Sequence, residues 1–357
     1  MGKKILAINP GSTSTKIAIF DGENQIFIKN IKHSSEELAN FKSIADQYDF
    51  RKHVILEELK MNDIDISTLD AVIGRGGLIK PVPSGVFKIN DLMRDHLRAG
   101  YAGEHASNLG GLIADSIASS IGLGVSYIAD PVVVDELQDL ARISGHPLFD
   151  NISIFHALNQ KAIARQYAKD VNKKYEELNL VVAHMGGGIS VGAHYQGRII
   201  DVNQALDGAG PFSPERSGTL PMNKVIKACY SGKYTYDEMR KMITGKGGYV
   251  AYFGTNDALG IEKAAAEGDP KAKLIENAMA YQVAKEIGSA SAVLKGKVDA
   301  IILTGGLAYG KPFVSQIKQY VSWIAPILEY PGEDEMRALA MNALMILNGE
   351  IEAKEYE

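Results

Sequence analysis

A strand–turn–strand pattern occurs twice in this chain, and its repetition constrains the fold more than any other feature. The first copy has an apolar run at residues 4–8, a turn at residues 9–16 and further apolar runs at residues 17–20 and 26–28. The second copy has apolar runs at residues 180–183, 191–194 and 199–202 around a turn at residues 184–190. Repeated hairpins of this kind predict an α/β chain made of two related halves.

The turns in both copies have the composition of phosphate-binding loops. Glycine adopts positive φ without a steric penalty and leaves backbone N–H groups open to an approaching anion, while serine adds hydroxyl donors. A third turn, at residues 304–308, follows an apolar run at residues 298–303. We therefore expect a nucleotide, with candidate contacts at Ser12, Ser14, Lys16, Gly186, Gly187, Gly188, Gly305, Gly306 and Leu307.

Length and charge favour an enzyme of two domains that acts on small molecules. The chain has 357 residues, more than one hydrophobic core usually holds. Its net charge of −5 includes no long basic run, which argues against nucleic acid or a membrane surface as partner. The single cysteine, Cys229, excludes an internal disulfide and is expected to be buried. With no apolar stretch near the ~20 residues of a membrane span, we expect a cytoplasmic protein.

Two apolar runs end in charged residues at positions where α/β sheets collect their ligands. The run at residues 69–74 ends at Arg75, and the run at residues 126–129 ends at Asp130. Between and after these runs, the spacing of apolar residues predicts helices at residues 104–121, 152–175, 270–295 and, opened by acidic residues, 333–347.

Several motifs, in order along the chain, resemble those of the butyrate kinases of the acetokinase family. They are residues 8–16 (Ile-Asn-Pro-Gly-Ser-Thr-Ser-Thr-Lys), 130–133 (Asp-Pro-Val-Val), 143–147 (Ile-Ser-Gly-His-Pro), 155–159 (Phe-His-Ala-Leu-Asn) and 184–188 (His-Met-Gly-Gly-Gly). The resemblance implies the ribonuclease H-like fold of actin, sugar kinases and acetate kinase, with two duplicated domains and a cleft between them. It implies an acyl-substrate domain of residues 1–148 plus about 331–357, and a nucleotide-binding domain of residues 149–330.

The implied reaction is reversible transfer of the γ-phosphoryl group of ATP to a short-chain fatty carboxylate, giving an acyl phosphate and ADP. Because both reactants are anions, the site needs cations, and arginine meets carboxylate and phosphate oxygens in pairs. Arg75 and Arg216 match arginines of the family pattern. His156 matches a histidine expected to donate a hydrogen bond to the transferring group. Asp130 matches an essential aspartate that could orient the carboxylate, accept its proton or support magnesium.

The resemblance also implies Mg²⁺, which bridges phosphate groups with few protein ligands. Asn9 and one acid of the group Glu333, Asp334 and Glu335 match the positions near the metal, with Glu333 and Asp334 expected first. His184 is expected to contact phosphate, and Asn256 to lie near the adenosine. The family's Asp-x-Arg pair is absent around Asn256. The family commonly forms homodimers, so a homodimer or higher homo-oligomer is expected.

The residues after Arg75 bear on the acyl group. Gly76 and Gly77 follow Arg75 directly, and Pro131 follows Asp130, so all three are expected at the substrate. Glycine removes side-chain bulk, and each buried methylene of a longer acid could contribute about 0.8 kcal/mol. We therefore expect butyrate, isobutyrate or another branched acid to be favoured over acetate, although one methylene discriminates only about 10–200-fold.

Other functions of the same fold remain open at this stage. An acetate or propionate kinase of the same family is one alternative. An actin-like or chaperone ATPase would share the hairpins but has no use for Arg75, Arg216 and His156 together. A sugar kinase would need polar groups where Gly76 and Pro131 lie. A dinucleotide-dependent dehydrogenase is disfavoured because Gly186–Gly188 leads into a strand rather than a helix.

Overall fold

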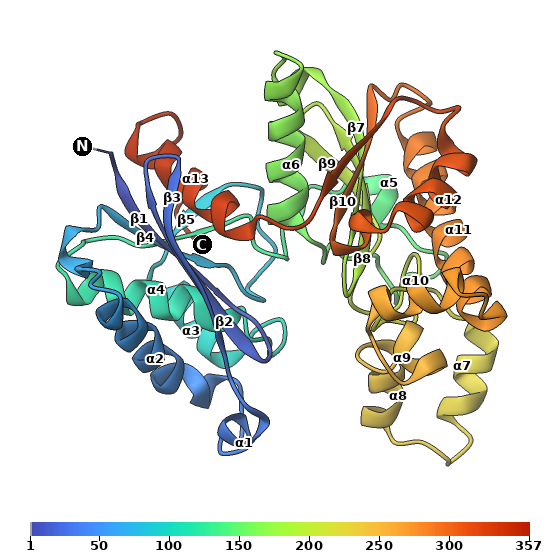
Figure 1. Cartoon of the computed structure of the whole chain (residues 1–357), viewed down its shortest axis with the longest axis horizontal. Coiled ribbons are helices and arrows are strands. Elements are labelled where there is room, and N and C mark those ends of the chain that lie inside the picture. The colour runs from blue at the N-terminus through green and yellow to red at the C-terminus, as the bar shows by residue number, and fades with distance from the viewer. Residues whose placement is uncertain (1) are drawn as a thin grey trace. The chain divides into compact units, whose positions relative to one another are not determined.

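The computed structural model describes residues 2–357 and divides into two compact units (Figure 1). Unit 1 comprises Met1–Val134 and Asp334–Glu357, and unit 2 comprises Asp135–Glu333. The first division between the units therefore lies after Val134, whereas the expected boundary was residue 148. Residues 135–148 group with the rest of unit 2, because the Gln138 N–H donates to the Ile200 carbonyl oxygen at 2.9 Å and Glu136 pairs with Lys161 at 2.7 Å.

Unit 1 is built on a six-stranded mixed sheet in the order β3-β2-β1-β4-β6-β5. Its strands are β1 (Lys4–Pro10), β2 (Ser14–Asp21), β3 (Asn24–Lys32), β4 (Ala71–Arg75), β5 (Val86–Lys88) and β6 (Tyr127–Ala129). Its helices are α1 (Ser35–Leu38), α2 (Tyr48–Met61), α3 (Asp91–Ala99), α4 (Asn108–Ser120) and α13 (Glu335–Leu347), with short 3₁₀ turns at Ala45–Gln47 and Ile66–Thr68.

Unit 2 is built on a five-stranded mixed sheet in the order β11-β10-β7-β8-β9. Its strands are β7 (Asn179–Met185), β8 (Ile189–Tyr195), β9 (Arg198–Val202), β10 (Ala300–Gly305) and β11 (Ile327–Pro331). Its helices are α5 (Asp139–Arg142), α6 (Ala157–Asp170), α7 (Met222–Cys229), α8 (Tyr236–Ile243), α9 (Gly248–Phe253), α10 (Ala258–Ala266), α11 (Pro270–Val293) and α12 (Lys311–Val321), with 3₁₀ turns η3 (Tyr175–Glu177) and η4 (Gly306–Tyr309).

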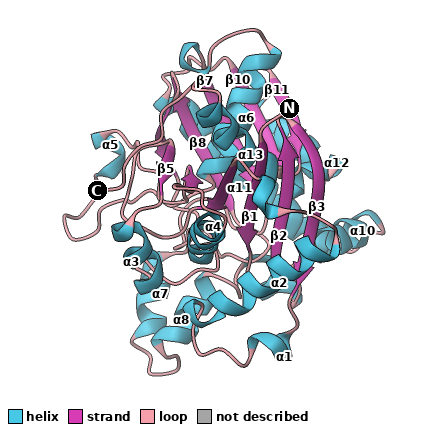
Figure 2. Ribbon diagram, turned by 90° about the vertical axis from the view of Figure 1, so that its left-hand side faces the viewer, coloured by secondary structure: helices cyan, strands magenta, loops and turns pink. Residues whose placement is uncertain are grey.

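The two sheets repeat one topology. In unit 1, β1 pairs antiparallel with β2 and parallel with β4, and β2 continues into β3. In unit 2, β7 pairs antiparallel with β8 and parallel with β10, and β8 continues into β9. Figure 2 shows the strands β1, β2 and β3 of the first hairpin pattern side by side. The duplicated hairpins predicted from the sequence are confirmed.

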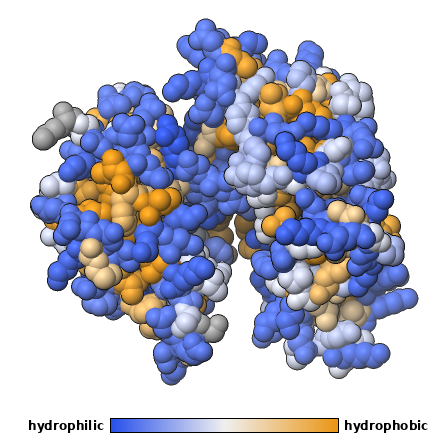
Figure 3. Space-filling view, viewed as in Figure 1, coloured by the Kyte–Doolittle hydropathy of each residue, from blue (hydrophilic) through white to orange (hydrophobic). Residues whose placement is uncertain are grey.

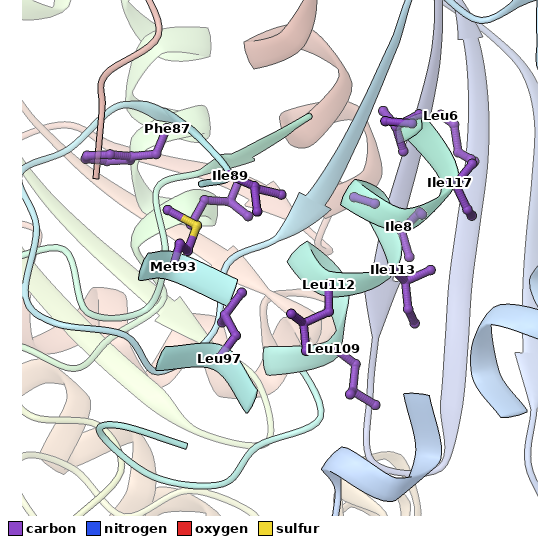
Figure 4. Close-up of a cluster of buried hydrophobic side chains, with 14 of the residues drawn as sticks. Leu6, Ile8, Phe87, Ile89, Met93, Leu97, Leu109, Leu112, Ile113 and Ile117 are labelled. Atoms are coloured by element: carbon purple, nitrogen blue, oxygen red, sulfur yellow. The ribbon is translucent and has the colours of Figure 1, made fainter. Parts of the chain in front are cut away.

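Each unit has its own hydrophobic core. In unit 1, Ile113 and Ile117 of α4 pack beside Leu6 and Ile8 of β1, and Leu112 lies toward α3 (Figure 4). In unit 2, α11 and α12 cover one face of the sheet with apolar residues that include the fully buried Val283, Ile287 and Ile317. Burial of this kind supplies most of the stability of an amphipathic helix. The strand ends that carry the candidate site are therefore held by rigid layers.

Three local predictions need correction. The helix expected at residues 152–175 is α6, Ala157–Asp170, because the Ile154 carbonyl accepts a hydrogen bond from the Ala205 N–H and the chain before α6 is extended. The helix expected from residue 104 begins at Asn108. Cys229 is exposed at the end of α7 rather than buried.

Hydrophilic residues cover most of the face of each unit that is visible in Figure 3, and apolar residues gather there in separate patches. Among residues 2–357, no helix combines the length and the apolar composition that crossing a membrane requires.

Candidate active site

A buried arginine binds the carbonyl oxygens of the turn between β1 and β2. Arg51 of α2 is fully buried, and its Nη1 donates to the carbonyl oxygens of Gly11 at 2.8 Å and Ser14 at 3.0 Å. Its Nη2 donates to the Ser12 carbonyl oxygen at 3.0 Å. Three carbonyl oxygens that would repel a phosphate are thus directed at one cation inside the protein. This turn is shaped to receive an anion on its other side.

Arg51 belongs to a buried polar network. Its Nε donates to Gln47 Oε1 at 3.0 Å and its Nη1 to Thr15 Oγ1 at 3.1 Å, while Thr15 Oγ1 contacts His33 Nε2 at 2.8 Å. Burial lowers the pKa of Arg51 to about 10, a value that still leaves the side chain charged at neutral pH. Burial, and then the charge of Arg51, lowers the pKa of His33.

The role of Arg51 was not predicted from the sequence, although its position in α2 carries a signal. Arg51 precedes Ile55 and Leu59 at a spacing of four residues, so all three lie on one face of α2, and all three are buried. A charged residue on the apolar face of a helix is rarely buried without a polar partner. Here the partners are backbone carbonyls, which a search for motif side chains does not reveal.

Arg75, Asn9 and Glu335 form a second cluster in unit 1. Arg75 ends β4, which lies next to β1, where Asn9 is found. Arg75 Nη1 lies 2.9 Å from Glu335 Oε1 and 3.4 Å from Asn9 Oδ1, and Asn9 Nδ2 donates to the same carboxylate. The structure thus brings together two of the predicted residues, Arg75 and Asn9, with an acid at the start of α13.

The other two acids of that segment lie elsewhere. The Asp334 carboxylate caps α13 by accepting a hydrogen bond from the Arg337 N–H at 3.0 Å. Glu333 belongs to unit 2, where its Oε1 lies 3.2 Å from His184 Nε2. The acid beside Asn9 is therefore Glu335, and not Glu333 or Asp334, which were expected first.

Asp130 follows β6, the neighbour of β4, and so lies at the same sheet edge as Arg75. Its side chain is 1% exposed, and its Oδ1 accepts hydrogen bonds from Ser84 Oγ at 2.6 Å and the Gly85 N–H at 2.8 Å. Its φ of 36° lies in a region that non-glycine residues rarely occupy. Such strain persists only where the surroundings hold it, and it is frequent at functional sites.

The prediction that Gly76 and Gly77 leave room for a longer acid is wrong. A Cβ on Gly77 would lie 2.3 Å from Asn108 Oδ1, and a Cβ on Gly76 would lie 2.6 Å from the Pro131 Cβ. Both glycines are buried, so the room they leave is already filled by Asn108 and Pro131. Gly77 allows the start of α4 to pack closely against the strand end, and Gly76 allows the close approach of Pro131, so neither glycine opens a pocket for a longer acid.

The second turn, at Gly186–Gly188 in unit 2, has histidines on one side. The rings of His156 and His184 are stacked with centroids 4.0 Å apart. His184 is buried, with its Nδ1 2.8 Å from Asn159 Oδ1 and its Nε2 facing Glu333. Both ring nitrogens of His184 thus face oxygen acceptors, and His156 lies between His184 and Ser190, whose Oγ is 2.8 Å from its Nδ1.

Arg216 lies on the other side of the second turn. Its Nη1 donates to the Ala205 carbonyl oxygen at 2.6 Å, and a Cβ on Gly188 would lie only 2.0 Å from that nitrogen. Gly188 therefore lacks a side chain because the guanidinium occupies its place. Ser213 Oγ donates to the Gly187 carbonyl oxygen at 2.6 Å and joins the loop before Arg216 to the turn.

Glu215 is a further residue that the sequence analysis missed. Its carboxylate would lie 3.6 Å from a Cβ on Gly187, and its Oε1 accepts a hydrogen bond from Asn256 Nδ2 at 2.5 Å. Asn256, predicted near the nucleotide, is therefore tied to the second turn through Glu215. The signal was weak, because a lone glutamate in a loop is usually a surface residue.

The third turn follows β10. Gly305 has a φ of 90°, and a Cβ there would lie 2.4 Å from the Met185 carbonyl oxygen, so glycine is required for the close approach of β10 to β7. Gly306 is exposed with open space at its Cβ position, and Leu307 is half-buried. Gly306 and Leu307, rather than Gly305, are therefore accessible to a ligand.

Comparison with known proteins gives concordant results. Residues 154–318 match the model of the Acetokinase family. The chain is 60% identical over 354 residues to Butyrate kinase 2 of Clostridium acetobutylicum, with 99% of each chain covered. Its fold is similar to that of Porphyromonas gingivalis acetate kinase, with a TM-score of 0.79 at 16% identity over 97% of this chain and 100% of that chain.

A propionate kinase from Francisella tularensis gives a TM-score of 0.71 at 18% identity, over 95% of this chain and 98% of that chain. At such low identities these two structures establish the fold alone. The predicted fold class, an α/β chain with two duplicated domains of the acetate kinase type, is confirmed.

Proposed function

The chain belongs to the acetokinase family, and we propose that it transfers the γ-phosphoryl group of ATP reversibly to a short-chain fatty carboxylate, butyrate in the first place. The observation that carries this proposal is the 60% identity to Butyrate kinase 2 of Clostridium acetobutylicum over 99% of both chains. The enzyme is a phosphotransferase with a carboxyl group as acceptor, and butyrate, isobutyrate and other branched acids are the substrates to test.

We assign the cations of the two units to the two anionic reactants. Arg75, at the end of β4, would hold the carboxylate, and Arg216, beside Gly188, would neutralise the transferring phosphoryl group. Arginine suits both tasks because its fork binds paired oxygens and remains charged. His156 would donate a hydrogen bond to the equatorial oxygens, where charge develops during transfer. Asp130, buried at the same sheet edge as Arg75, would orient the substrate carboxylate.

For the nucleotide, we propose that the first and second turns receive the phosphates. The buried Arg51 supports this role for Ser12 and Ser14, and Ser213 holds Gly187 in place. His184, being buried, would support His156 rather than meet phosphate itself. Asn256, Gly306 and Leu307 would lie toward the adenosine. The acyl-substrate role would then belong to unit 1 and the adenosine contacts to unit 2, while both units would contribute a turn to the phosphates.

The residues of unit 1 fit a magnesium ion of the kind that kinases use. Glu335 offers a carboxylate and Asn9 an amide oxygen within one cluster, in which the Asn9 NH₂ group donates to Glu335 and Asn9 Oδ1 lies 3.4 Å from Arg75 Nη1. Mg²⁺ prefers such oxygen ligands, with waters and phosphates completing its shell. Within residues 2–357, no cluster of three or more His, Cys, Asp or Glu side chains forms a protein-only metal cage. When bound, Mg²⁺ offsets charge on the phosphate groups. Asn9 and Glu335 would position it, and Arg75 would orient Glu335.

The test is formation of acyl phosphate, trapped with hydroxylamine, from ATP, Mg²⁺ and a series of acids. The series comprises acetate, propionate, butyrate, isobutyrate and a sugar as a negative control. We expect kcat/KM to be greatest for butyrate or isobutyrate. A maximum at acetate or propionate would replace the proposed substrate and keep the chemistry. ATP hydrolysis without hydroxamate for any acid would overturn the proposal in favour of an ATPase.

A further inference from the structure

A buried chain of polar side chains runs behind His156. Ser190, Gly192 and His194 alternate along β8, so they share one face of the strand. On α6, Gln160 lies one turn after His156, and its backbone N–H donates to the His156 carbonyl oxygen at 3.0 Å. Ser190, Gln160 and His194 are all fully buried.

The orientation of the Gln160 amide follows from a backbone group. Gln160 Nε2 lies 3.1 Å from the Ser190 carbonyl oxygen, which can only accept, so this atom must be the NH₂ group. The same NH₂ group donates to Ser190 Oγ at 2.8 Å. Gln160 Oε1 is then the atom that faces His194 Nε2 at 3.0 Å. Because Oε1 can only accept, His194 carries its proton on Nε2.

The hydrogen bonds of His194 on its other side agree with this arrangement. Complete burial, and then the charge of Lys161, lowers the pKa of His194 well below its usual value, so the ring is neutral. With its proton on Nε2, its Nδ1 is an acceptor, and the Tyr175 hydroxyl, 2.7 Å away, donates to it. Every proton from Tyr175 to Gln160 therefore has one position.

At the other end of this series of hydrogen bonds, Ser190 contacts His156. Ser190 Oγ already accepts a hydrogen bond from Gln160, and its own proton needs an acceptor in a fully buried place. Among the contacts of the described residues, that acceptor is His156 Nδ1, at 2.8 Å. If His156 donated from Nδ1 instead, the buried Ser190 hydroxyl proton would have no acceptor among the residues that the structure describes.

We propose that Tyr175, His194, Gln160 and Ser190 are positioning residues that fix His156 in the tautomer with Nδ1 as acceptor and the proton on Nε2. Resting on the proposed function, this makes Nε2–H of His156 the donor to the phosphoryl group. Because the hydrogen-bond chain fixes the tautomer before substrates bind, no proton has to be rearranged during transfer.

The absence of a side chain at position 192 supports the proposed hydrogen bond between Gln160 and His194. Gly192 is not one of the described glycines with a positive φ, so its backbone conformation does not require glycine. A Cβ there would lie 2.4 Å from Gln160 Oε1 and 3.2 Å from His194 Nε2. Glycine at this position thus makes room for the hydrogen bond between Gln160 and His194.

The direct test is ¹⁵N NMR of the full-length protein labelled at histidine, with the His156 signals assigned by comparison with a His156→Asn variant. We expect an unprotonated Nδ1 and a protonated Nε2 in the wild type. A proton on Nδ1 would overturn the proposal. This readout does not use catalysis, so it decides the tautomer even if the chain forms no acyl phosphate, a result that would count against the proposed function instead.

A substitution then tests the link to turnover. Ser190→Ala should produce a mixture of His156 tautomers and lower kcat at least about tenfold, with KM for both substrates within about twofold. Ser190→Thr, which keeps the hydroxyl, should recover most of the lost kcat. Ser291→Ala is the matched control, since Ser291 is also a buried serine of unit 2 but donates to the Ile287 carbonyl of its own helix. An unchanged tautomer and kcat in Ser190→Ala would contradict the proposal.

Discussion

His156 and His184 lie ring on ring, with centroids 4.0 Å apart and planes inclined by 24°. His184 is held on both edges, by Asn159 at Nδ1 and by Glu333 at Nε2, and is buried behind His156. His156 is thus supported on a ring face by His184 and at Nδ1 by Ser190. A ring fixed in both ways suits a hydrogen-bond donor that must meet a transferring phosphoryl group in one geometry.

Replacing His184 tests this support. His184→Gln keeps a polar side chain but removes the ring, so His156 can tilt, and we expect kcat to fall about tenfold with little change in KM for ATP. Steady-state kinetics would measure the effect. His146→Gln is the control, because His146 is an exposed histidine of the same unit. Equal kcat values in His184→Gln and the wild type would remove the stack from the mechanism.

Arg216 is predicted to act mainly in the transition state. Arg216→Ala should lower kcat by about 10³-fold, the scale at which an arginine stabilises phosphoryl transfer, while the protein stays folded. Arg240→Ala serves as control, since Arg240 is an exposed arginine of the same unit at 4.0 Å from Asp207. Turnover of Arg216→Ala within threefold of that of Arg240→Ala would exclude Arg216 from the site.

Magnesium dependence distinguishes Glu335 from its neighbour Asp334. Glu335→Gln removes the charge beside Asn9 and should raise the Mg²⁺ concentration for half-maximal activity about tenfold. Asp334→Asn should leave that concentration unchanged, because Asp334 caps α13 and asparagine caps helices equally well. A larger shift in Asp334→Asn than in Glu335→Gln would reverse the assignment.

Arg51 should matter for both stability and nucleotide binding. Arg51→Met leaves three turn carbonyls without their donor and should lower the free energy of unfolding by about 3 kcal/mol. Arg51→Lys keeps the charge but not the fork, and should raise KM for ATP with a smaller loss of stability. Chemical denaturation and kinetics would measure both effects, with the exposed Lys60→Met on the same helix as control. A KM for ATP unchanged in both Arg51 variants would show that the turn does not bind phosphate.

Buried histidines predict a loss of stability in mild acid. The pKa values of His33 and His194 are lowered by burial, so below about pH 6.5 the unfolded chain binds more protons than the folded one. Stability therefore falls as pH decreases from about 6.5, by at most about 1.4 kcal/mol per pH unit for each histidine. Denaturation midpoints from pH 7.5 to 5 would show this slope.

A variant identifies the source of that slope. His33→Gln should flatten the slope, whereas His53→Gln, at an exposed position, should not. His33 faces Arg51 and Glu37, whose charges act on its pKa in opposite directions. A slope unchanged by His33→Gln would assign the acid sensitivity to other groups.

The sequence was informative where local pattern and topology coincide. The hairpin turns at Gly11 and Gly186 could be predicted because glycine, serine and alternating apolar runs are local signals, and Arg75 because it ends a buried strand. The duplicated sheets followed from the same pattern. The choice of Glu335 among adjacent acids could not be predicted, since it depends on where α13 begins relative to Asn9.

The remaining differences have a common physical cause, which is packing between distant segments. The sequence predicts free space beside Gly77, but Asn108 fills that space in the fold. Arg51 acts through backbone carbonyls, which carry no sequence signature. The hydrogen bonds that link Ser190 to Gln160 join a strand to a helix 30 residues away, a contact that no local pattern indicates.

The central claim is that a carboxylate oxygen attacks the γ-phosphorus of ATP. The most direct measurement is ³¹P NMR of the enzyme with ATP, Mg²⁺ and butyrate, with an otherwise identical mixture lacking butyrate as control. We predict an acyl phosphate resonance that grows together with ADP and only when butyrate is present. AMP with pyrophosphate, or ADP with inorganic phosphate at a rate that butyrate does not change, would contradict the assignment.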